Sequence, residues 1–342
     1  MKLTIHTYIL KTRKVFTTSH GSADHRRCLI VELEHEGCKG YGEATEILYY
    51  GKNLEAMVRL VQGNKEWIES LPMADPLDRY LEFFSRFSED RFVLCALDVA
   101  YHDLYGKLKG QSLTRMWGLD RSHNPLSSLT VAIDETEKML EHIDQNPWPV
   151  YKVKLGTPQD MEIMQAIRRH TDHPLRVDVN EGWSAAQTIA YSSTLRDLEV
   201  EFIEQPIPAR EHDSMAEVFR KSALPLFADE SCHIPEDVPR CLQHFHGINI
   251  KLMKCGGLSP ALEMIRLART LGLKIMIGCM TETSVGISAL GQILPLVDYA
   301  DMDGALLISN DPAAGVHLED GRAVYPDEGG TGARLITENP LA

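Results

Sequence analysis

Three carboxylate residues follow short apolar segments at similar spacing in the second half of the chain. Asp178 ends LRVD, Glu204 ends EFIE and Asp229 follows LFA. Neither cysteine nor histidine accompanies them, so the implied ligands are hard oxygen donors, the type that Mg²⁺ prefers. Any single one is explained equally well as a cap on the helix after its strand. All three at the same place relative to their strands predict a magnesium site.

Two lysines flank this trio in chain order. Lys154 ends YKVK and Lys251 follows INI, so each lies two strand positions from Glu204. In a closed barrel they would face each other across the metal and serve as acid and base on opposite faces of a substrate carbon. A lone lysine at a strand end is more often a solvated charge, but a second lysine and a divalent cation would lower its pKa. Lys152, one pleat period from Lys154, would add to this positive field.

The chemistry that fits this set is removal of a proton next to a carboxylate. Such a carbon acid is very weak, and its ionisation doubles the negative charge on the oxygens, so a preorganised cation must stabilise the product. Donors of this kind are typically worth about 3 to 4 kcal/mol each, and a dication supplies several more. The residues therefore predict metal-assisted proton abstraction.

These side chains converge only if the fold brings many strand ends together. After Asn124-Pro125, short apolar strands alternate with helices, the order that gives a parallel sheet with crossover helices. Eight strands are expected, in SLTVAI, VYKVKL, LRVDVN, EFIEQP, LFADES, GINIKL, KIMIGCM and YADMDG. Polar residues recur at intervals of 24, 24, 26, 25 and 22 residues in the series Thr130, Lys154, Asp178, Glu204, Asp229 and Lys251. A barrel of eight parallel strands places all these ends on one face.

The expected fold class is α/β, a modified TIM barrel of the (β/α)7β type with an α+β N-terminal capping domain. Residues 1–123, with alternating strands followed by helical patterns, are expected to form the capping domain. Residues 124–310 are expected to form the barrel, with seven full crossover helices. Residues 311–342 are expected to be a C-terminal segment that returns to the capping domain.

Composition argues against several classes of function. The net charge is −14, from 35 Lys+Arg and 49 Asp+Glu without a basic stripe, which argues against nucleic acid as a partner. No apolar run reaches membrane-spanning length, and the N-terminus lacks the apolar core of a signal peptide. Seven scattered cysteines without CxxC spacing are typical of reduced thiols. We expect a cytoplasmic enzyme acting on a small molecule, with homo-oligomerisation left open.

Five motifs in order, KVKLG, DVNEGW, EQP, ADES and NIKLMKCGG, resemble the muconate-lactonizing branch of the enolase superfamily. The segment CALDVAYHDLYGKLKGQSL is similar to the last long helix of that family's capping domain, so the resemblance spans nearly the whole chain. It implies a Mg²⁺ cofactor and a specific set of roles. The implied metal ligands are Asp178, Glu204 and Asp229, and the implied acid/base pair is Lys154 and Lys251.

The same resemblance implies roles for the residues around these five. Lys152 would assist the substrate carboxylate, while Asn180 and Glu230 would orient the metal ligands. Within NIKLMK the base corresponds to Lys251, which leaves Lys254 as a lesser candidate.

The eighth strand segment points to one group within the superfamily. In YADMDG, Asp301 and Asp303 lie two residues apart on one face, a geometry suited to an ammonium group, although two solvated loop carboxylates would read the same way. Dipeptide epimerases have a similar DxD pair, and Thr130 matches a threonine that contacts the dipeptide in that group. One position departs: Gly21 stands where Ala-Glu epimerases carry an arginine that binds the substrate side chain. Arg26 and Arg27 are close by in sequence.

The resemblance therefore implies an isomerase of the L-Ala-D/L-Glu epimerase family. It would invert the α-carbon of the C-terminal residue of a dipeptide by 1,1-proton transfer through a Mg-stabilised enolate, without restriction to Ala-Glu. N-acyl amino acid racemase, o-succinylbenzoate synthase and muconate cycloisomerase activities would use the same site, but their substrates carry no ammonium for Asp301 and Asp303. A catalytically silent ligand-binding barrel is the alternative of another class.

One further cluster, CLQHFH, contains soft-metal ligand types. Cys241, His244 and His246 fall in a segment expected to be helical and lack a second ligand cluster, so a zinc site is disfavoured.

Overall fold

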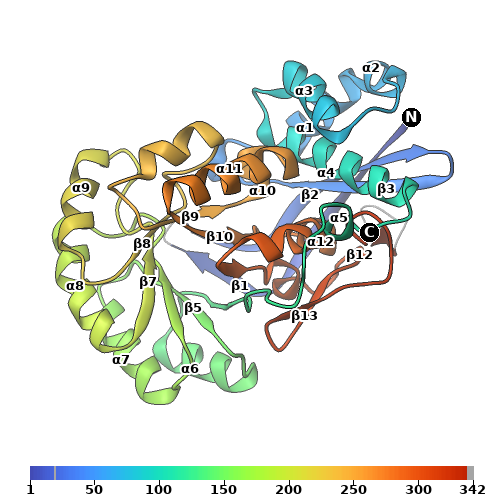
Figure 1. Ribbon diagram of the computed structural model, residues 1–342. Helices are drawn as coiled ribbons and strands as arrows, with labels where there is room; N and C mark the ends of the chain where they lie inside the picture. The colour runs from blue at the N-terminus through green and yellow to red at the C-terminus, as the bar shows by residue number, and fades with distance from the viewer. Residues whose placement is uncertain (19–20, 337–342) are drawn as a thin grey trace.

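A three-stranded antiparallel sheet begins the chain. The computed structural model describes residues 1–18 and 21–336 (Figure 1). β1 (Lys2–Thr18) and β2 (Gly21–His35) form a long hairpin, and β3 (Cys38–Thr45) pairs with β2. The period-two alternation of the sequence correctly predicted this arrangement.

Helices follow the sheet and pack against it. We call the region from β1 through the last of these helices (residues 2–116) the cap; its α-helices are α1 (Leu54–Gly63), α2 (Lys65–Ser70), α3 (Pro76–Phe87), α4 (Arg91–Leu108) and α5 (Leu113–Met116). α4 is buried along most of its length and lies directly on β3. A Cβ at Gly42 would come within 2.0 Å of the Ala96 carbonyl oxygen, so this close approach requires glycine.

Eight parallel strands form the second part of the structure. They pair in strict chain order, and Ser128 N donates to Ala300 O at 3.0 Å where the last strand meets the first. The expected eight-stranded barrel is thereby confirmed. The strands are β4 (Leu129–Val131), β5 (Tyr151–Lys154), β6 (Leu175–Asp178), β7 (Val200–Glu204), β8 (Leu226–Ala228), β9 (Gly247–Ile250), β10 (Lys274–Gly278) and β11 (Tyr299–Asp301).

Helices cover the outside of the barrel (Figure 1). They are α6 (Thr136–Gln145), α7 (Asp160–His170), α8 (Ala185–Asp197), α9 (His212–Lys221), α10 (Leu252–Cys255), α11 (Leu258–Leu271) and α12 (Ser284–Ile293). The expectation of seven full crossover helices was wrong at one place. Between β8 and β9 lies only the 3-10 helix η2 (Pro235–Cys241), because Pro239 inside it lacks a backbone N–H. The predicted helix over CLQHFH was also wrong, because Gln243 has φ 66°, a left-handed conformation that interrupts a helix.

The C-terminal segment contacts both parts of the chain. Its strands are β12 (Ala313–Ala314), β13 (His317–Glu319), β14 (Arg322–Val324) and β15 (Arg334–Leu335). Thr331 N donates to Asp103 Oδ1 of α4 at 2.7 Å, and Ser127 N beside β4 donates to Gly321 O at 2.8 Å. The division into domains at residues 1–123, 124–310 and 311–342 stays a prediction.

Buried polar contacts hold the cap against the barrel. Asp98 of α4 accepts hydrogen bonds from Ser259 N (3.0 Å) and Ser259 Oγ (2.8 Å) at the start of α11. Gly257 just before α11 has φ +125°, and a Cβ there would lie 2.3 Å from Asp98 Oδ2. Glu43 of β3 accepts from Thr283 N and, at 2.5 Å, from Thr283 Oγ1 at the start of α12. These contacts fix the cap over the strand ends.

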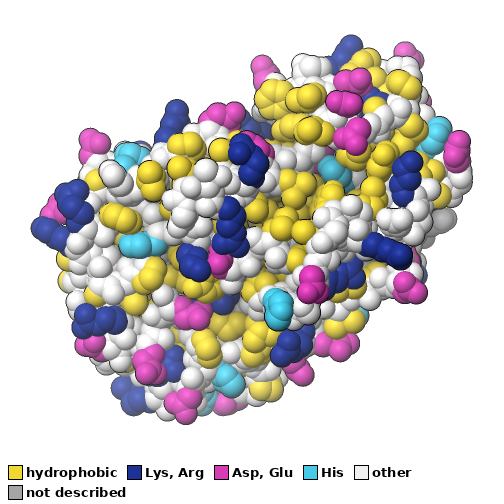
Figure 2. All heavy atoms as spheres, viewed as in Figure 1, with side chains coloured by type: hydrophobic (Ala, Val, Ile, Leu, Met, Phe, Trp, Pro, Cys, Tyr) yellow, Lys and Arg dark blue, Asp and Glu magenta, His cyan; other side chains and the backbone are white. Residues whose placement is uncertain are grey.

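The surface shown in Figure 2 mixes acidic and basic side chains without a continuous basic stripe. Apolar side chains gather over α3, where Leu77, Leu81 and Phe84 are exposed. Over the residues that the structure describes, no helix combines the length and the apolar character needed to cross a membrane.

Candidate active site

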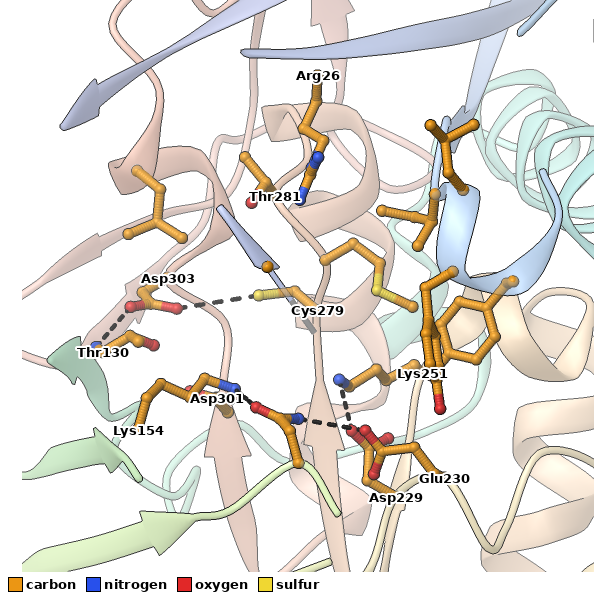
Figure 3. Close-up of a pocket in the computed structure, with 18 of the residues that line it drawn as sticks. Arg26, Thr130, Lys154, Asp229, Glu230, Lys251, Cys279, Thr281, Asp301 and Asp303 are labelled. Atoms are coloured by element: carbon orange, nitrogen blue, oxygen red, sulfur yellow. Dashed lines mark hydrogen bonds and ion pairs between the residues drawn. The ribbon is translucent and has the colours of Figure 1, made fainter. Parts of the chain in front are cut away.

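The predicted polar series lies at the C-terminal ends of the barrel strands. In the sheet register Lys154 stands opposite Asp178, and Asp178 opposite Glu204, so three strand ends are level with one another. They lie beneath a cavity of about 320 Å³, which also has residues of the cap in its lining (Figure 3). This position is where barrel enzymes place their active sites, and the volume suits a small molecule.

The three predicted metal ligands converge on one another, and one of them, Asp229, lines this cavity. One carboxylate oxygen from each of Asp178, Glu204 and Asp229 lies within 4.8 Å of the others, and all three side chains are buried. It is the one group of this kind found among the described residues. Three buried carboxylates need compensating positive charge. Their oxygen-only donor set fits Mg²⁺ and contains none of the sulfur or imidazole ligands that favour zinc.

Buried lysines surround the trio. Lys152 Nζ lies 2.7 Å from Glu204 Oε2 and 3.1 Å from Asp178 Oδ2. Lys154 Nζ lies 2.6 Å from Asp178 Oδ2. Lys251 Nζ lies 2.8 Å from Asp229 Oδ2. Figure 3 shows Lys154 and Lys251 on opposite sides of the cavity, as expected from their strand positions.

Burial and neighbouring charges shift the pKa values of the ionisable groups in this cluster in different directions. Burial acts to raise the pKa of Asp178, but Lys154 and Lys152 outweigh it and lower the pKa to about 2. Burial and the nearby Asp178 raise the pKa of Glu204 to about 7. Burial would lower the pKa of Lys251, yet Asp229 raises it well above the usual value. The lowered lysine pKa expected in the presence of magnesium stays a prediction.

The predicted ammonium site lies at one end of the cavity. Asp301 Oδ2 accepts from Lys152 Nζ at 2.5 Å, and Asp301 Oδ1 accepts from Ser128 Oγ at 2.9 Å. Asp303 Oδ2 accepts from Thr130 N at 2.7 Å. Burial and the charge of Asp301 raise the pKa of Asp303 to about 6. Thr130, Asp301 and Asp303 all line the cavity, so the structure brings this predicted set together.

Asn180 and Glu230 lie beside the three carboxylates. Asn180 N donates to Asp178 Oδ1 at 3.0 Å, and its side chain accepts from Lys154 Nζ at 3.2 Å. Asn180 Nδ2 donates to Glu230 Oε1 at 3.2 Å. Asn180 has φ 43°, in the left-handed region that asparagine tolerates better than most residues. Its backbone turn thus lets one residue contact three charged side chains.

Two contacts to the trio were missed in the sequence. Asn249 Nδ2 donates to Glu204 Oε1 at 2.6 Å. Asn249 is one pleat period before Lys251, so strand alternation contained the signal. Lys254 Nζ lies 2.5 Å from Asp229 Oδ1 and also donates to the Asp229 carbonyl. Lys254 therefore contacts Asp229 without lining the cavity, whereas Lys251 lines it.

The roof of the cavity, formed by cap residues, separates the two neighbouring arginines. Arg26 lines the cavity, whereas Arg27 binds Glu46 and Glu55, each at 2.5 Å. Successive strand residues point to opposite faces of β2, which explains the separation. Gly21 also lines the cavity.

The side chains of CLQHFH that could bind zinc do not lie close enough together to form a metal site. Cys241 is buried at the end of η2, and the ring of His244 packs at a tilt against that of His212 with ring centroids 3.9 Å apart. His246 Nδ1 instead accepts from Leu226 N at 3.1 Å. Among described residues these side chains form no group able to hold a metal ion.

A closed parallel barrel with acidic and basic side chains at its strand ends, covered by a separate α+β cap, defines a class of barrel enzymes. The family profile described as "Enolase C-terminal domain-like" matches residues 134–339. An L-Ala-D/L-amino acid epimerase from Flavobacterium johnsoniae is 45% identical over 98% of this chain and 100% of its own length. One from Maribacter sp. is 46% identical over 98% and 99%. The chain therefore belongs to the dipeptide epimerases of the enolase superfamily.

A solved structure agrees with this assignment. The Dipeptide Epimerase from Methylococcus capsulatus, complexed with Mg and the dipeptide L-Arg-D-Lys, superimposes with a TM-score of 0.88 at 30% identity. The match covers 97% of this chain and 99% of that one. The expected fold class is confirmed, as is the expected family.

Proposed function

We propose that this protein is a Mg²⁺-dependent dipeptide epimerase, which inverts the α-carbon of the C-terminal residue of a dipeptide. The observation that carries the proposal is the pair of lysines, Lys154 and Lys251, on opposite sides of one cavity above three converging carboxylates. The names of the relatives support the same activity.

Each carboxylate of the trio has one role in this proposal. Asp178, Glu204 and Asp229 would hold the magnesium ion, which would supply positive charge to stabilise the negative charge of a substrate carboxylate. Asn180 and Glu230 orient the ligands. Lys152, buried between the trio and Asp301, adds a fixed positive charge beside the substrate carboxylate.

The two lysines move the proton. One lysine, as the free amine, accepts the α-proton from one face of the substrate carbon and becomes an ammonium. The other, as an ammonium, donates a proton to the opposite face, so the carbon is inverted and the overall charge is unchanged. Epimerisation in the reverse direction exchanges their roles.

The acidic end of the cavity recognises the free amino terminus. Asp301 and Asp303 accept hydrogen bonds from the substrate ammonium, and Thr130 lies beside them. This site favours dipeptides over N-acylated amino acids, which carry no ammonium. The relatives named for L-Ala-D/L-amino acids support a range of second residues beyond glutamate.

Other expectations belong with this proposal. The enzyme acts in the cytoplasm, which the absence of a disulfide among its seven cysteines supports. It needs no nucleic acid or membrane, and homo-oligomerisation stays open. We retain the division into a capping domain (1–123), a barrel (124–310) and a returning C-terminal segment (311–342).

A screen in D₂O tests the proposal. The purified protein with Mg²⁺ is incubated with a library of L,L-dipeptides, and mass spectrometry follows deuterium. We expect one deuterium on the C-terminal residue with the native protein, and no deuterated product of inverted configuration with Lys154→Ala or Lys251→Ala after the same time. No exchange with any dipeptide would reject the activity, and exchange with N-acyl amino acids instead would assign a racemase.

A further inference from the structure

A second cavity lies next to the active-site cavity. It has a volume of about 240 Å³, and Glu230 lines both cavities. Figure 3 shows Glu230 beside Asp229, one of the three converging carboxylates. Cys241, at the end of η2, lines the second cavity and not the first. A small molecule in the second cavity therefore meets a thiol that is separate from the substrate site.

A second cysteine is the neighbour of this thiol. The side chains of Cys232 and Cys241 form a hydrogen bond with each other, and the two residues are 0% and 2% exposed. The chain between them is folded back by Asp237, whose Oδ2 accepts from His233 N at 3.0 Å and from Ile234 N at 3.2 Å. Because this turn is already formed, joining the two sulfurs requires little further ordering of the chain.

The backbone of Cys232 is connected to the metal-binding trio. Cys232 N donates to Asp229 O at 3.2 Å. Cys232 O accepts from Lys254 Nζ at 3.2 Å, and the same Nζ lies 2.5 Å from Asp229 Oδ1. A displacement of Cys232 therefore disturbs the contacts that orient Asp229. Loss of a contact that orients a metal ligand typically weakens metal binding by about 10 to 100-fold.

We propose that Cys232 and Cys241 are an oxidation-sensitive pair, which a hydroperoxide converts to a disulfide that weakens Mg²⁺ binding through Asp229. Covalently bonded sulfurs lie closer together than hydrogen-bonded ones, so the disulfide displaces Cys232 relative to Lys254. Disulfides of cytosolic proteins are usually transient and redox-sensing, as this one would be. The formation of the disulfide is independent of the proposed epimerase function, and only its effect on turnover rests on that function.

The oxidation takes place in two balanced steps. Cys241, which lines the second cavity, attacks one oxygen of hydrogen peroxide as the thiolate. An S–O bond forms, the O–O bond breaks, and the leaving hydroxide takes up a proton and departs as water. Cys232 then attacks the sulfenic sulfur of Cys241, so that the S–S bond forms and the S–O bond breaks. The oxygen leaves as a second water molecule with the proton of the Cys232 thiol, and the two thiols have supplied the two electrons that reduce the peroxide.

Peptide mapping tests the disulfide directly. The reduced protein is treated with hydrogen peroxide, its remaining thiols are alkylated, and its tryptic peptides are analysed without reduction. Trypsin cleaves after Arg240, so Cys232 and Cys241 fall on different peptides. We expect these two peptides to be linked, with a mass two hydrogen atoms below their sum, and dithiothreitol to separate them. Absence of the linked species, or linkage of other cysteines in its place, would overturn the proposal.

The dependence of thermal unfolding on Mg²⁺ tests the consequence without any substrate. The oxidised protein should need about tenfold or more Mg²⁺ for the same rise in the midpoint of unfolding as the reduced protein. Epimerisation at low Mg²⁺ concentration should fall on oxidation and recover with dithiothreitol. A linked peptide without a change in the dependence on Mg²⁺ would overturn the effect on the metal site.

Matched variants assign the response to this pair. Cys241→Ala should abolish the effect of peroxide on the Mg²⁺ dependence, and Cys232→Ala should do the same, which keeps the test valid if one variant fails to fold. Cys95→Ala removes an equally buried thiol from α4, also 2% exposed, and should retain the effect. A peroxide response that persists in both variants of the pair would contradict the proposal. Absence of turnover by the reduced native protein would reject the epimerase function and leave the peptide map unaffected.

Discussion

The floor and the roof of the cavity follow different physical rules. The floor consists of barrel strand ends, where the ionic groups are buried and paired: Lys154 with Asp178 at 2.6 Å and Lys251 with Asp229 at 2.8 Å. The roof consists of cap residues, in which Leu48 is 73% exposed and Arg26 has no partner among the described residues. The side chains of the floor are held in place by one another before a substrate binds. The roof presents side chains whose contacts a bound substrate would supply.

This contrast assigns catalysis to the floor of the cavity and substrate selectivity to its roof. Proton abstraction from a weak carbon acid needs charges held in place in advance, which a paired, buried network on rigid strands provides. Selection among side chains needs a surface that can vary without disturbing that network, and the cap, which is built separately from the barrel strands, provides one. Changes to the floor should therefore affect all dipeptides alike, and changes to the roof should affect some more than others.

Removal of the metal should cause the largest effect, because it acts on the floor alone. Treatment with a chelator should reduce α-proton exchange by about 10³-fold or more for every dipeptide, and added Mg²⁺ should restore it. The midpoint of thermal unfolding should rise with Mg²⁺ concentration, since the ion binds only the folded trio. If α-proton exchange continued unchanged after exhaustive chelation, the proposal that catalysis depends on a metal ion would be wrong.

Loss of either catalytic lysine should have the second-largest effect on epimerisation. Lys154→Ala and Lys251→Ala should each reduce epimerisation by about 10² to 10⁴-fold, the usual contribution of general acid/base catalysis. Each variant should still exchange the α-proton of one epimer and not of the other, measured by mass spectrometry in D₂O. Lys154→Arg is the control that keeps the charge without an available base. Full activity in that variant would show that Lys154 supplies only charge.

Asp303 at the acidic end should have a smaller and selective effect. Asp303→Asn should lower kcat/KM for dipeptides by about 10 to 100-fold, the range for a hydrogen bond to a charged group. An N-acetylated dipeptide, which carries no ammonium, should lose much less. Equal losses for the free and the acetylated substrate would place the role of Asp303 in holding Thr130 instead.

Most of the floor could be predicted because strand geometry repeats. The barrel places one residue per strand at the same height, so the regular spacing of Asp178, Glu204 and Asp229 predicted that they lie together. In the structure their carboxylate oxygens lie within 4.8 Å of one another. Asn249 followed the same alternation and was missed because an amide is a weaker signal than a charge. Pro239 prevented the predicted α-helix, a local effect that the alternating strand and helix pattern does not contain.

The roof could not be predicted in the same way. Arg26 and Arg27 are chemically identical neighbours, and the register of β2 with β1, in which Arg26 stands opposite Leu10 and Arg27 opposite Ile9, decides which one faces the cavity. The contacts between the cap and the barrel could not be predicted from the sequence either. Glu43 and Glu282 are 239 positions apart in the numbering, and nothing in their local sequence indicates that their charges interact.

That junction supplies the smallest expected effect, which concerns stability and not turnover. Burial raises the pKa of Glu43 to about 7, and burial together with Glu43 raises the pKa of Glu282 well above its usual value. Each carboxyl thus binds its proton more tightly in the folded chain than in the unfolded chain. As pH rises from about 4.5 through 7, the unfolded chain releases these protons more readily than the folded chain does. The free energy of unfolding therefore falls over this pH range.

Glu282→Gln removes one of the two titrating groups and keeps its shape. Its midpoint of thermal unfolding should exceed that of the native protein by about 2 to 4 °C at pH 8, with a smaller difference at pH 5, where the native carboxyls are protonated. Calorimetry at the two pH values measures this. Asp311, which also raises the pKa of Glu43, remains in both proteins, so the difference isolates Glu282. An equal shift at both pH values would mean that packing, and not charge, sets the stability of the junction between floor and roof.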